Sequence, residues 1–312
     1  VEGDNTYQVN DDFFDGGENG TSNTENDLVL DQETTQLNQA YLQYSLDGTT
    51  IKAGNQRIVL DNQRHVGGVA FRQDEATFDA VSVKSTALSN TTIFAAVANN
   101  RNTIKNENTE EDITLLNIKY AVSKDIAASA FFYGIEDSDG DSLDTFGLRS
   151  NGSASGFGFE AEVATQSNSV TSDETMYLHL AGSKKIAGIK ATVGYEMLGS
   201  DSGNLAFMTP LGTNHKFFGW TDVMLNGNKF SQEDGLEDIY ASAVTKVGGV
   251  KLVGQFHSFS SSEGGDDLGN EFGFLAAKKF GSYGASLKLA QYNAGDFGVD
   301  VTKVWLTGTA KF

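Results

Sequence analysis

Three arginines lie close together in one stretch of a chain that is otherwise acidic. The stretch is AGNQRIVLDNQRHVGGVAFRQDEATFDAV, residues 53 to 81, and it contains Arg57, Arg64 and Arg72. The planar guanidinium group binds carboxylates through paired hydrogen bonds, so these side chains suit sugar acids. At the narrowest point of an aqueous pore they would favour anionic or polyhydroxyl solutes. The alternative is that they pair with acidic neighbours and hold a loop against a wall. Those neighbours are Asp61, Asp74, Glu75 and Asp79.

A second stretch, GIEDSDGDSLD at residues 134 to 144, gathers carboxylates around a glycine. Its aspartates are Asp137, Asp139, Asp141 and Asp144. Calcium takes about six to eight oxygen ligands in flexible geometry, so such a loop offers candidate ligands. The spacing departs from the EF-hand pattern, and the stretches NDDFFDGGEN and SEGGDDLG are similarly acidic. We therefore keep two interpretations, a calcium site and a solvated acidic loop. No other cofactor is indicated.

The histidines offer no recognisable catalytic arrangement. They are His65, His179, His215 and His257, and no Gly-x-Ser-x-Gly nucleophile motif is present in the sequence. His179 and His257 fall on the polar faces of expected strands, where an interior histidine usually makes hydrogen bonds. We expect no enzyme activity.

Composition excludes several classes of protein. The 312 residues include 35 glycines, one proline and no cysteine, and the formal net charge is -20. A nucleic-acid-binding protein would need a basic face, and a disulfide framework would need cysteines. No apolar run reaches the roughly 18 residues of a membrane-spanning helix. The scarcity of proline favours paired strands.

Segments of alternating polarity recur from residue 38 to the end of the chain. The last of them, DVTKVWLTGTAKF, places Val304, Leu306 and Phe312 on one face and Lys303 on the other. Similar alternation occurs in NQAYLQYSL, GFGFEAEVA, GIKATVGYEM and VKLVGQFHSF. Strands of about ten residues with one apolar face are typical of transmembrane barrels, in which that face meets lipid.

The connections between these strands alternate between short and long. The long ones are expected at about residues 3–36, 55–75, 100–112, 135–143, 166–174, 198–236, 259–269 and 293–299. Outer-membrane barrels keep short turns at the periplasmic end and long loops outside. The sequence therefore predicts an all-β protein, a transmembrane antiparallel up-and-down β-barrel, as a single domain over residues 1–312 with long acidic extracellular loops.

The strand count is about fifteen, whereas closed bacterial barrels have an even number. The chain opens on VEGDNTYQ without a methionine, and Val1 and Glu2 resemble the tail of an outgoing strand. We therefore expect about 16 to 18 strands in the complete barrel, with one or more N-terminal strands missing from this chain.

Charged residues on the polar strand faces predict a water-filled interior, in which they stay hydrated and are not buried without a partner. They are Glu160, Glu162, Lys190, Glu196, Lys251 and Lys288.

The arginine-rich stretch, together with GTNHKFFGWTD at 212–222 and LNQAYLQYS at 37–45, resembles the alginate-export family of outer-membrane barrels. This resemblance implies a channel in the outer membrane of a Gram-negative bacterium, lined by the arginines, with Asn214, His215 and Lys216 on an inward-folded loop. Where the family commonly has Gly-Arg-Gln, this chain has Gly54, Asn55 and Gln56.

The sequence thus predicts a monomeric porin for passive diffusion of small hydrophilic solutes, saccharides or acidic sugars. Outer-membrane lipid, lipopolysaccharide and the solutes are the expected partners, and nucleic acid is not. The alternative is a plugged recognition barrel whose acidic loops bind calcium, lipopolysaccharide or a phage. Segment 198–236 distinguishes the two interpretations. A channel requires that this segment folds inward and leaves a gap, whereas a plugged barrel requires that it fills the interior.

Overall fold

The protein folds into one large antiparallel sheet of 16 strands, each paired with the next along the chain. The computed structural model describes residues 1–7, 33–69, 71, 74–171, 174–201, 205–225, 233–296 and 298–312. The strands of the sheet are β1 (Glu2–Thr6), β2 (Thr34–Leu46), β3 (Thr49–Gln56), β4 (Thr77–Ser85), β5 (Thr91–Asn102), β6 (Asp112–Ala121), β7 (Ile126–Glu136), β8 (Ser142–Ala154), β9 (Phe157–Asn168), β10 (Glu174–Ile186), β11 (Ile189–Leu198), β14 (Leu236–Val247), β15 (Val250–Ser260), β16 (Asp267–Phe280), β17 (Tyr283–Asn293) and β18 (Val301–Ala310).

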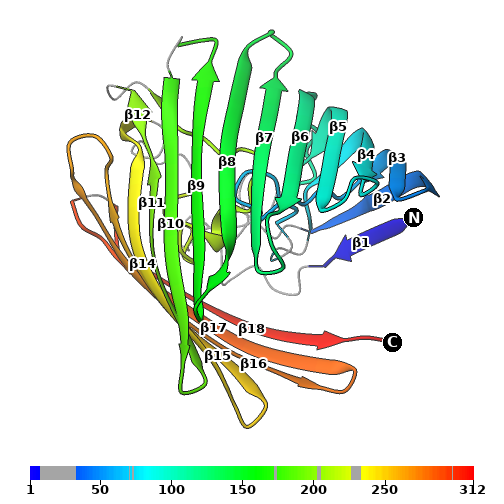
Figure 1. Ribbon diagram of the computed structural model, residues 1–312. Helices are drawn as coiled ribbons and strands as arrows, with labels where there is room; N and C mark the ends of the chain where they lie inside the picture. Colours follow the sequence, from blue (N-terminus) through cyan, green and yellow to red (C-terminus); the bar gives the residue numbers. More distant parts are fainter. Residues whose placement is uncertain are drawn as a thin grey trace.

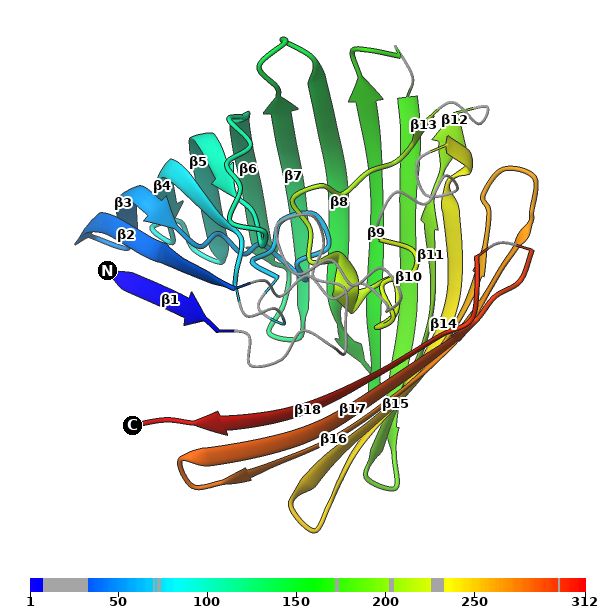
Figure 2. The same cartoon turned by 180° about the vertical axis from the view of Figure 1, so that it is seen from behind.

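The sheet curls around an interior, with β1 and β18 as its two edges (Figures 1 and 2). In the described part of the chain no ladder joins these two strands. The predicted all-β, antiparallel up-and-down architecture is confirmed. The outgoing strand inferred from Val1 and Glu2 is also present, and it extends to Thr6.

Long and short connections alternate as predicted. Tight turns such as Asp47-Gly48 and Ala187-Gly188 join strands at one end, and the longer connections, as far as the structure describes them, start and finish at the other. The longest described segment, between β11 and β14, carries the small hairpin of β12 (Ser200–Asp201) and β13 (Leu205–Ala206), followed by a short 3-10 helix, η1 (Asn214–Lys216). Among the described residues no helix has the length and hydrophobicity needed to cross a membrane.

The strands bear apolar side chains on the outer face. Leu42 is 82% exposed, Val193 64% and Leu306 84%, although they lie in the middle or later parts of well-paired strands. The residues that alternate with them face the interior, and Lys303 beside Val304 is 8% exposed. Water would not stabilise such an apolar outer face, so the predicted lipid-facing role is supported by geometry.

The core lies inside the curled sheet, where two long connections turn inward. Residues 57–69, between β3 and β4, and residues 205–225, between β11 and β14, cross the interior (Figure 2). Their apolar residues pack against the inner wall. From the connections come Ile58, Val66, Phe207, Leu211, Phe218 and Met224, and from the wall Phe78, Ile113, Leu115, Phe131, Tyr177, Leu236 and Phe259.

Gly54 shapes the point at which the first inward connection leaves the wall. Its φ is +123°, and a Cβ at this position would lie 2.3 Å from the backbone oxygen of Ala40 on β2. We expect Gly54→Ala to lower the free energy of unfolding by roughly 1–3 kcal/mol, because only glycine adopts this backbone without strain. Urea unfolding in lipid vesicles measures the change. Gly182→Ala is the control, since a Cβ there meets nothing within 4 Å, and an equal loss in both variants would contradict the expectation.

Candidate functional site

Arg64 ties the first inward connection to both the wall and the second connection. Its Nε donates to Oε1 of Glu196 on β11 at 2.6 Å, and its Nη1 donates to Thr209 Oγ1 at 2.8 Å and to Asn214 Oδ1 at 2.9 Å. The side chain is fully buried, and it lies over the ring of Phe218 with Cζ 4.4 Å from the ring centre. Arg64 therefore joins three parts of the chain and presents no surface to a passing solute.

The surroundings of Arg64 keep it charged. Burial alone would lower the pKa of its guanidinium, but the Glu196 carboxylate and the neighbouring Tyr177 hydroxyl outweigh burial and raise the pKa above its usual value. Tyr177 also donates to the same Glu196 oxygen at 2.5 Å. The predicted structural role of this arginine is thus present, but its partner is Glu196, which is distant in sequence, and not one of the acidic neighbours named above.

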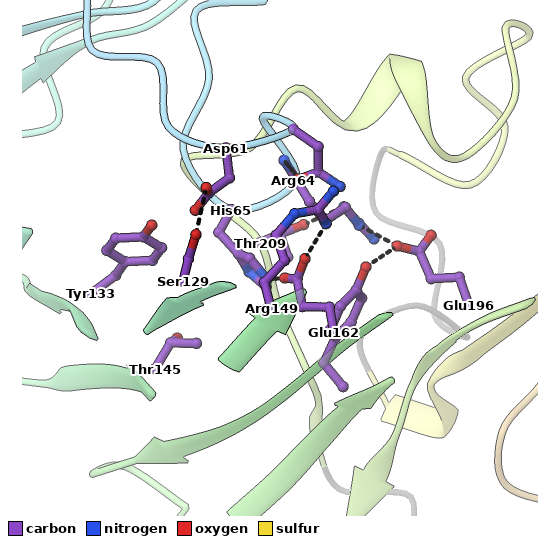
Figure 3. Close-up of polar contacts among 12 residues, drawn as sticks. Asp61, Arg64, His65, Ser129, Tyr133, Thr145, Arg149, Glu162, Glu196 and Thr209 are labelled. Carbon is purple, nitrogen blue, oxygen red and sulfur yellow. Dashed lines mark hydrogen bonds and ion pairs between the residues drawn. The ribbon is translucent and has the colours of Figure 1, made fainter. Parts of the chain in front are cut away.

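Two residues beside Arg64 fix the same connection along the wall (Figure 3). Asp61 accepts from Asn117 Nδ2 on β6 at 2.6 Å and from Ser129 Oγ on β7 at 3.2 Å. The His65 ring places Nε2 2.5 Å from Oε1 of Glu162 on β9. Together with Glu196 these contacts spread the connection over the inner faces of β6 to β11.

Glu162 is shared between His65 and Arg149 (Figure 3). Nη1 of Arg149, on β8, donates to Oε2 of Glu162 at 2.6 Å, and Nη2 donates to Glu160 at 2.5 Å. Glu162 and Arg149 are buried, whereas the Glu160 side chain is 44% exposed. Glu160 is therefore the member of this group that remains open to the interior space.

The second inward connection is anchored on the opposite side of the sheet. Glu271 on β16, which is fully buried, accepts from the backbone N–H of Trp220 at 2.5 Å and of Thr221 at 2.9 Å, and from the Thr221 hydroxyl at 2.5 Å. Lys303 Nζ on β18 donates to the Thr221 carbonyl at 2.6 Å. Residues 205–225 therefore span the interior between the walls formed by β9 to β11 and by β16 to β18.

His215 and Lys288 form the other half of this second anchor. His215 Nδ1 lies 2.6 Å from Asp222 Oδ1, and its Nε2 lies 2.6 Å from Lys288 Nζ on β17. The Lys288 ammonium also lies over aromatic rings, 3.6 Å from the ring centre of Phe71 and 4.7 Å from that of Trp305. Cation–π contacts of this kind stabilise a buried ammonium group. His215 is therefore buried between Asp222 of its own connection and Lys288 of the wall, where its role is structural.

Of the two described arginines of the first connection, Arg57 is the accessible one. Its guanidinium pairs with Glu75 through two hydrogen bonds, and its side chain is 40% exposed. The hydrogen bond to Glu75 raises the pKa of Arg57, which stays charged. The alternative interpretation, in which the arginines pair with acidic neighbours, holds for Arg57, whose partner is Glu75. Arg72 lies outside the described residues, so its predicted place in a constriction remains a prediction.

The segment Asn214–Lys216 separates two cavities. Asn214 and His215 line a cavity of about 390 Å³ on the long-loop side, together with Arg101 and Lys105. Lys216 lines a cavity of about 210 Å³ on the short-turn side, and its Nζ donates to the Asn62 carbonyl at 2.8 Å. In the described part of the chain the two cavities share no lining residue. The resemblance-based assignment of this segment to an inward loop agrees with its position.

The cavity on the short-turn side is lined mainly by polar side chains of the wall, and Asn62, Lys216 and Phe217 of the inward connections complete it. Its walls come from β9, β10, β11, β14 and β15, and its lining residues include Glu160, His179, Glu196, Tyr240, Ser242, Gln255 and His257. His179 Nε2 lies 2.8 Å from the Tyr240 hydroxyl, and His257 Nδ1 lies 2.7 Å from Asp238. Both histidines are therefore interior hydrogen-bonding groups, as predicted.

Within segment 198–236, residues 205–225 fold inward, as a channel requires, and they leave cavities on both of their sides. Residues 202–204 and 226–232 lie outside the described residues.

The aspartates of the predicted calcium loop do not converge. Asp137 Oδ1 accepts from the backbone N–H of Asp139 at 2.9 Å and of Asp141 at 3.0 Å, which closes the turn between β7 and β8. Asp144 lies on β8, opposite Gly134 of β7. Over the ranges that the structure describes, no group of three or more His, Asp or Glu side chains is arranged to hold a metal ion. Calcium binding stays a prediction without geometric support.

The expectation that these charged residues stay hydrated is wrong for part of the wall, although none of the three named next is buried without a partner. Glu162, Glu196 and Lys288 do face inward, but each is buried and pairs with a residue of an inward connection. The alternation along the strands predicted that these side chains point into the barrel, but it carried no information about the inward connections that cover them. Glu271 and Lys303 anchor the second connection in the same way. The sequence analysis did not name Glu271, although the alternation within its strand indicates that its side chain faces inward.

Comparison with known proteins agrees with this geometry. The sequence profile described as Alginate export matches residues 4–197. No curated protein matches the chain. Similar solved structures include OccAB4 of Acinetobacter baumannii, with a TM-score of 0.68 at 12% identity over 86% of this chain and 73% of that one.

Two further similar structures are from Pseudomonas aeruginosa. OccK5 (OpdH) has a TM-score of 0.65 at 12% identity, and the match covers 90% of this chain and 82% of that one. OpdK, determined with vanillate, has a TM-score of 0.67 at 13% identity, and the match covers 86% and 77%. At these identities the likeness concerns the fold.

Proposed function

Because the chain belongs to the alginate export family of outer-membrane β-barrels, we propose that it is a passive channel for small hydrophilic solutes. The observation that carries the proposal is the partition formed by Asn214–Lys216, with a cavity on each side. Solute passage is limited by the two inward connections, which exclude large molecules by size. Saccharides and acidic sugars are the proposed solute class.

The constriction that we propose differs from the one expected from the arginines alone. Arg57 and Lys216 supply accessible positive charge, and Asn214 supplies an amide. Arg64 acts indirectly, because it holds Asn214 and Thr209 in place. The selection of solutes by size then depends on the buried ion pair of Arg64 with Glu196, which holds the partition in place. The selection of solutes by charge depends on the exposed cations Arg57 and Lys216.

Lys216→Glu is expected to shift ion preference toward cations. The change replaces a positive charge on the partition by a negative one, and charged rings in narrow pores set ion preference. We expect the anion-to-cation permeability ratio to fall by roughly severalfold, measured as the reversal potential across a potassium chloride gradient. Lys184→Glu, which changes the outer face, is the control, and equal shifts in both variants would remove Lys216 from the constriction.

Solute entry tests the proposed solute class. Proteoliposomes containing the folded protein should swell in galactose and in galacturonate, and more slowly in a large oligosaccharide, because the partition excludes by size. Equal swelling in all three solutes would contradict a narrow constriction. Swelling in none of them would contradict the channel and favour a plugged recognition barrel.

A monomeric state and contact with lipopolysaccharide complete the proposal. Apolar side chains cover the outer faces of strands from β2 to β18, so lipid can surround each chain on its own. Sedimentation in detergent of matched density tests this part, and a trimer would contradict it.

A further inference from the structure

The cavity on the short-turn side of the partition has buried polar atoms without a partner in its lining residues. Nδ1 of His179, Nε2 of Gln255 and Nδ2 of Asn62 are buried, and none has a hydrogen-bond partner among the residues that the structure describes. All three residues line this cavity of about 210 Å³. Native proteins rarely bury a polar group without a partner, and each such group calls for an explanation. A polar molecule in the cavity supplies one.

Close packing against two glycines holds these side chains on the wall. His179 is 3% exposed, and its other ring nitrogen lies 2.8 Å from the Tyr240 hydroxyl. Tyr240 pairs in register with Gly194 of β11, where a Cβ would lie 2.3 Å from the tyrosine Cζ. Gln255 pairs in register with Gly273 of β16, where a Cβ would lie 2.6 Å from its Cγ. The glycines therefore leave the room that these side chains occupy beside the cavity.

Aromatic rings form another part of the lining. The ring planes of His179 and Tyr240 differ by 12° with centres 6.1 Å apart, and those of Tyr240 and His257 differ by 25° with centres 5.7 Å apart. Phe217 of the second inward connection also lines the cavity. Such rings offer apolar surface, and tyrosine adds a polar tip. The cavity therefore combines ring surface with hydrogen-bonding groups.

The charges around the cavity are of both signs and already have partners. The carboxylates of Glu160 and Glu196 line it, and they pair with Arg149 and Arg64 respectively. Lys216 lines it as well, and its Nζ donates to a backbone carbonyl. A negatively charged solute would meet two carboxylates beside the single ammonium group of the lining. This balance gives an anion no advantage over a neutral solute.

We infer that this cavity is a subsite for the ring of one neutral sugar. A hydroxyl group donates and accepts hydrogen bonds, so sugar hydroxyls can pair with the amide N–H groups of Asn62 and Gln255 and with the Glu160 carboxylate. A pyranose also has an apolar C–H face that suits aromatic rings. The inference deepens the proposed channel function and rests on it, because it names the class of saccharide that the interior recognises.

The position of the subsite agrees with a role in solute passage. Lys216 and Phe217 place it directly against the partition. Glu160 also lines a larger cavity of about 590 Å³, which reaches the turn residues Lys124 and Asp125. The subsite thus lies between the partition and the space at the short-turn end of the barrel.

Equilibrium dialysis of radiolabelled galactose against the folded full chain in detergent tests the inference, with galacturonate as the acidic comparison. We expect galactose to bind more tightly than galacturonate, and sodium chloride to leave galactose binding unchanged, because salt screens charges and the sugar has none. Gln255→Leu, and separately Ser242→Ala, should each weaken galactose binding roughly two- to tenfold, the usual effect of one lost hydrogen bond.

The chain supplies a matched control for the glutamine variant. Gln43 on β2 is exposed and does not line the cavity. Gln43→Leu should therefore leave galactose binding within about twofold of the wild type. Equal weakening by Gln43→Leu and Gln255→Leu would overturn the inference.

Stability distinguishes a binding role of Gln255 from a structural one. Nε2 of Gln255 has no partner in the described part of the chain, so its removal takes no hydrogen bond of that atom from the fold. We expect Gln255→Leu to unfold at the same urea concentration as the wild type or at a higher one. A variant that loses stability and galactose binding together would overturn the inference, because the amide would then be structural.

The sugars themselves provide the remaining outcomes. Tighter binding of galacturonate than of galactose would overturn the inference in favour of an anion site. Absence of galactose binding to the wild type would also overturn it, and water would then be the partner of the buried atoms. Galactose binding to a protein that does not let vesicles swell would contradict the channel and leave the subsite standing. Swelling in galactose without binding would do the reverse, so the two failures are distinguishable.

Discussion

Replacing Arg64 by methionine is expected to lower the free energy of unfolding by about 3–5 kcal/mol, the usual consequence of leaving a buried charge without its partner. Glu196 would keep the Tyr177 hydrogen bond but lose its countercharge. Thr209 and Asn214 would also lose a shared donor. Unfolding in urea, followed by tryptophan fluorescence in lipid vesicles, measures the loss.

The same variant should conduct more ions than the wild type. Arg64 joins the two inward connections to each other and to β11, so its loss frees the partition to move. We expect single-channel conductance to rise and to become noisier.

A double variant separates a lost ion pair from a general packing defect. Combining Arg64→Met with Glu196→Leu removes both buried charges together, and apolar replacements of a whole buried pair are often close to neutral. We therefore expect the double variant to recover most of the stability lost in Arg64→Met. If it is less stable than the single variant, the charge pair is not the source of the effect.

Glu271→Ala is expected to detach the second connection from the opposite wall. Its carboxylate accepts two backbone donors and one hydroxyl, and all are buried or partly buried. Hydrogen bonds to a charged group contribute about 1.5–3 kcal/mol each. Because the freed donors regain some water, we expect a net loss of roughly 3 kcal/mol. Unfolding midpoints in urea provide the measurement.

Glu271→Gln is the matched comparison for that variant. It removes the same charge but keeps one acceptor oxygen for the donors of Trp220 and Thr221. Its stability should lie between those of the wild type and Glu271→Ala, and its conductance should stay closer to the wild type. Identical behaviour of the two variants would mean that charge, and not anchoring, explains the phenotype.

The strand pattern predicted most of the fold because alternation is a local property. Val304, Leu306 and Lys303 could be assigned to opposite faces from their spacing alone, and the structure agrees. The alternation of long and short connections followed in the same way. The bounds of β1 were harder, since its partner strand begins beyond a long connection.

The interior site was predictable only in part, because its contacts are long-range. Arg64 and Glu196 are separated by 132 positions, and no local signal pairs them. The acidic neighbours of the arginines were the natural candidates in sequence, but for the two arginines that the structure describes only the pair of Arg57 with Glu75 forms.

Planar-bilayer conductance of the purified, folded protein tests the channel most directly, with a potassium chloride gradient across the membrane. The structure predicts stepwise single-channel currents in the wild type and larger steps in Arg64→Met, because the partition limits flow. A silent wild-type protein that retains its folded gel mobility, and stays silent when Arg64 is replaced, would contradict the account.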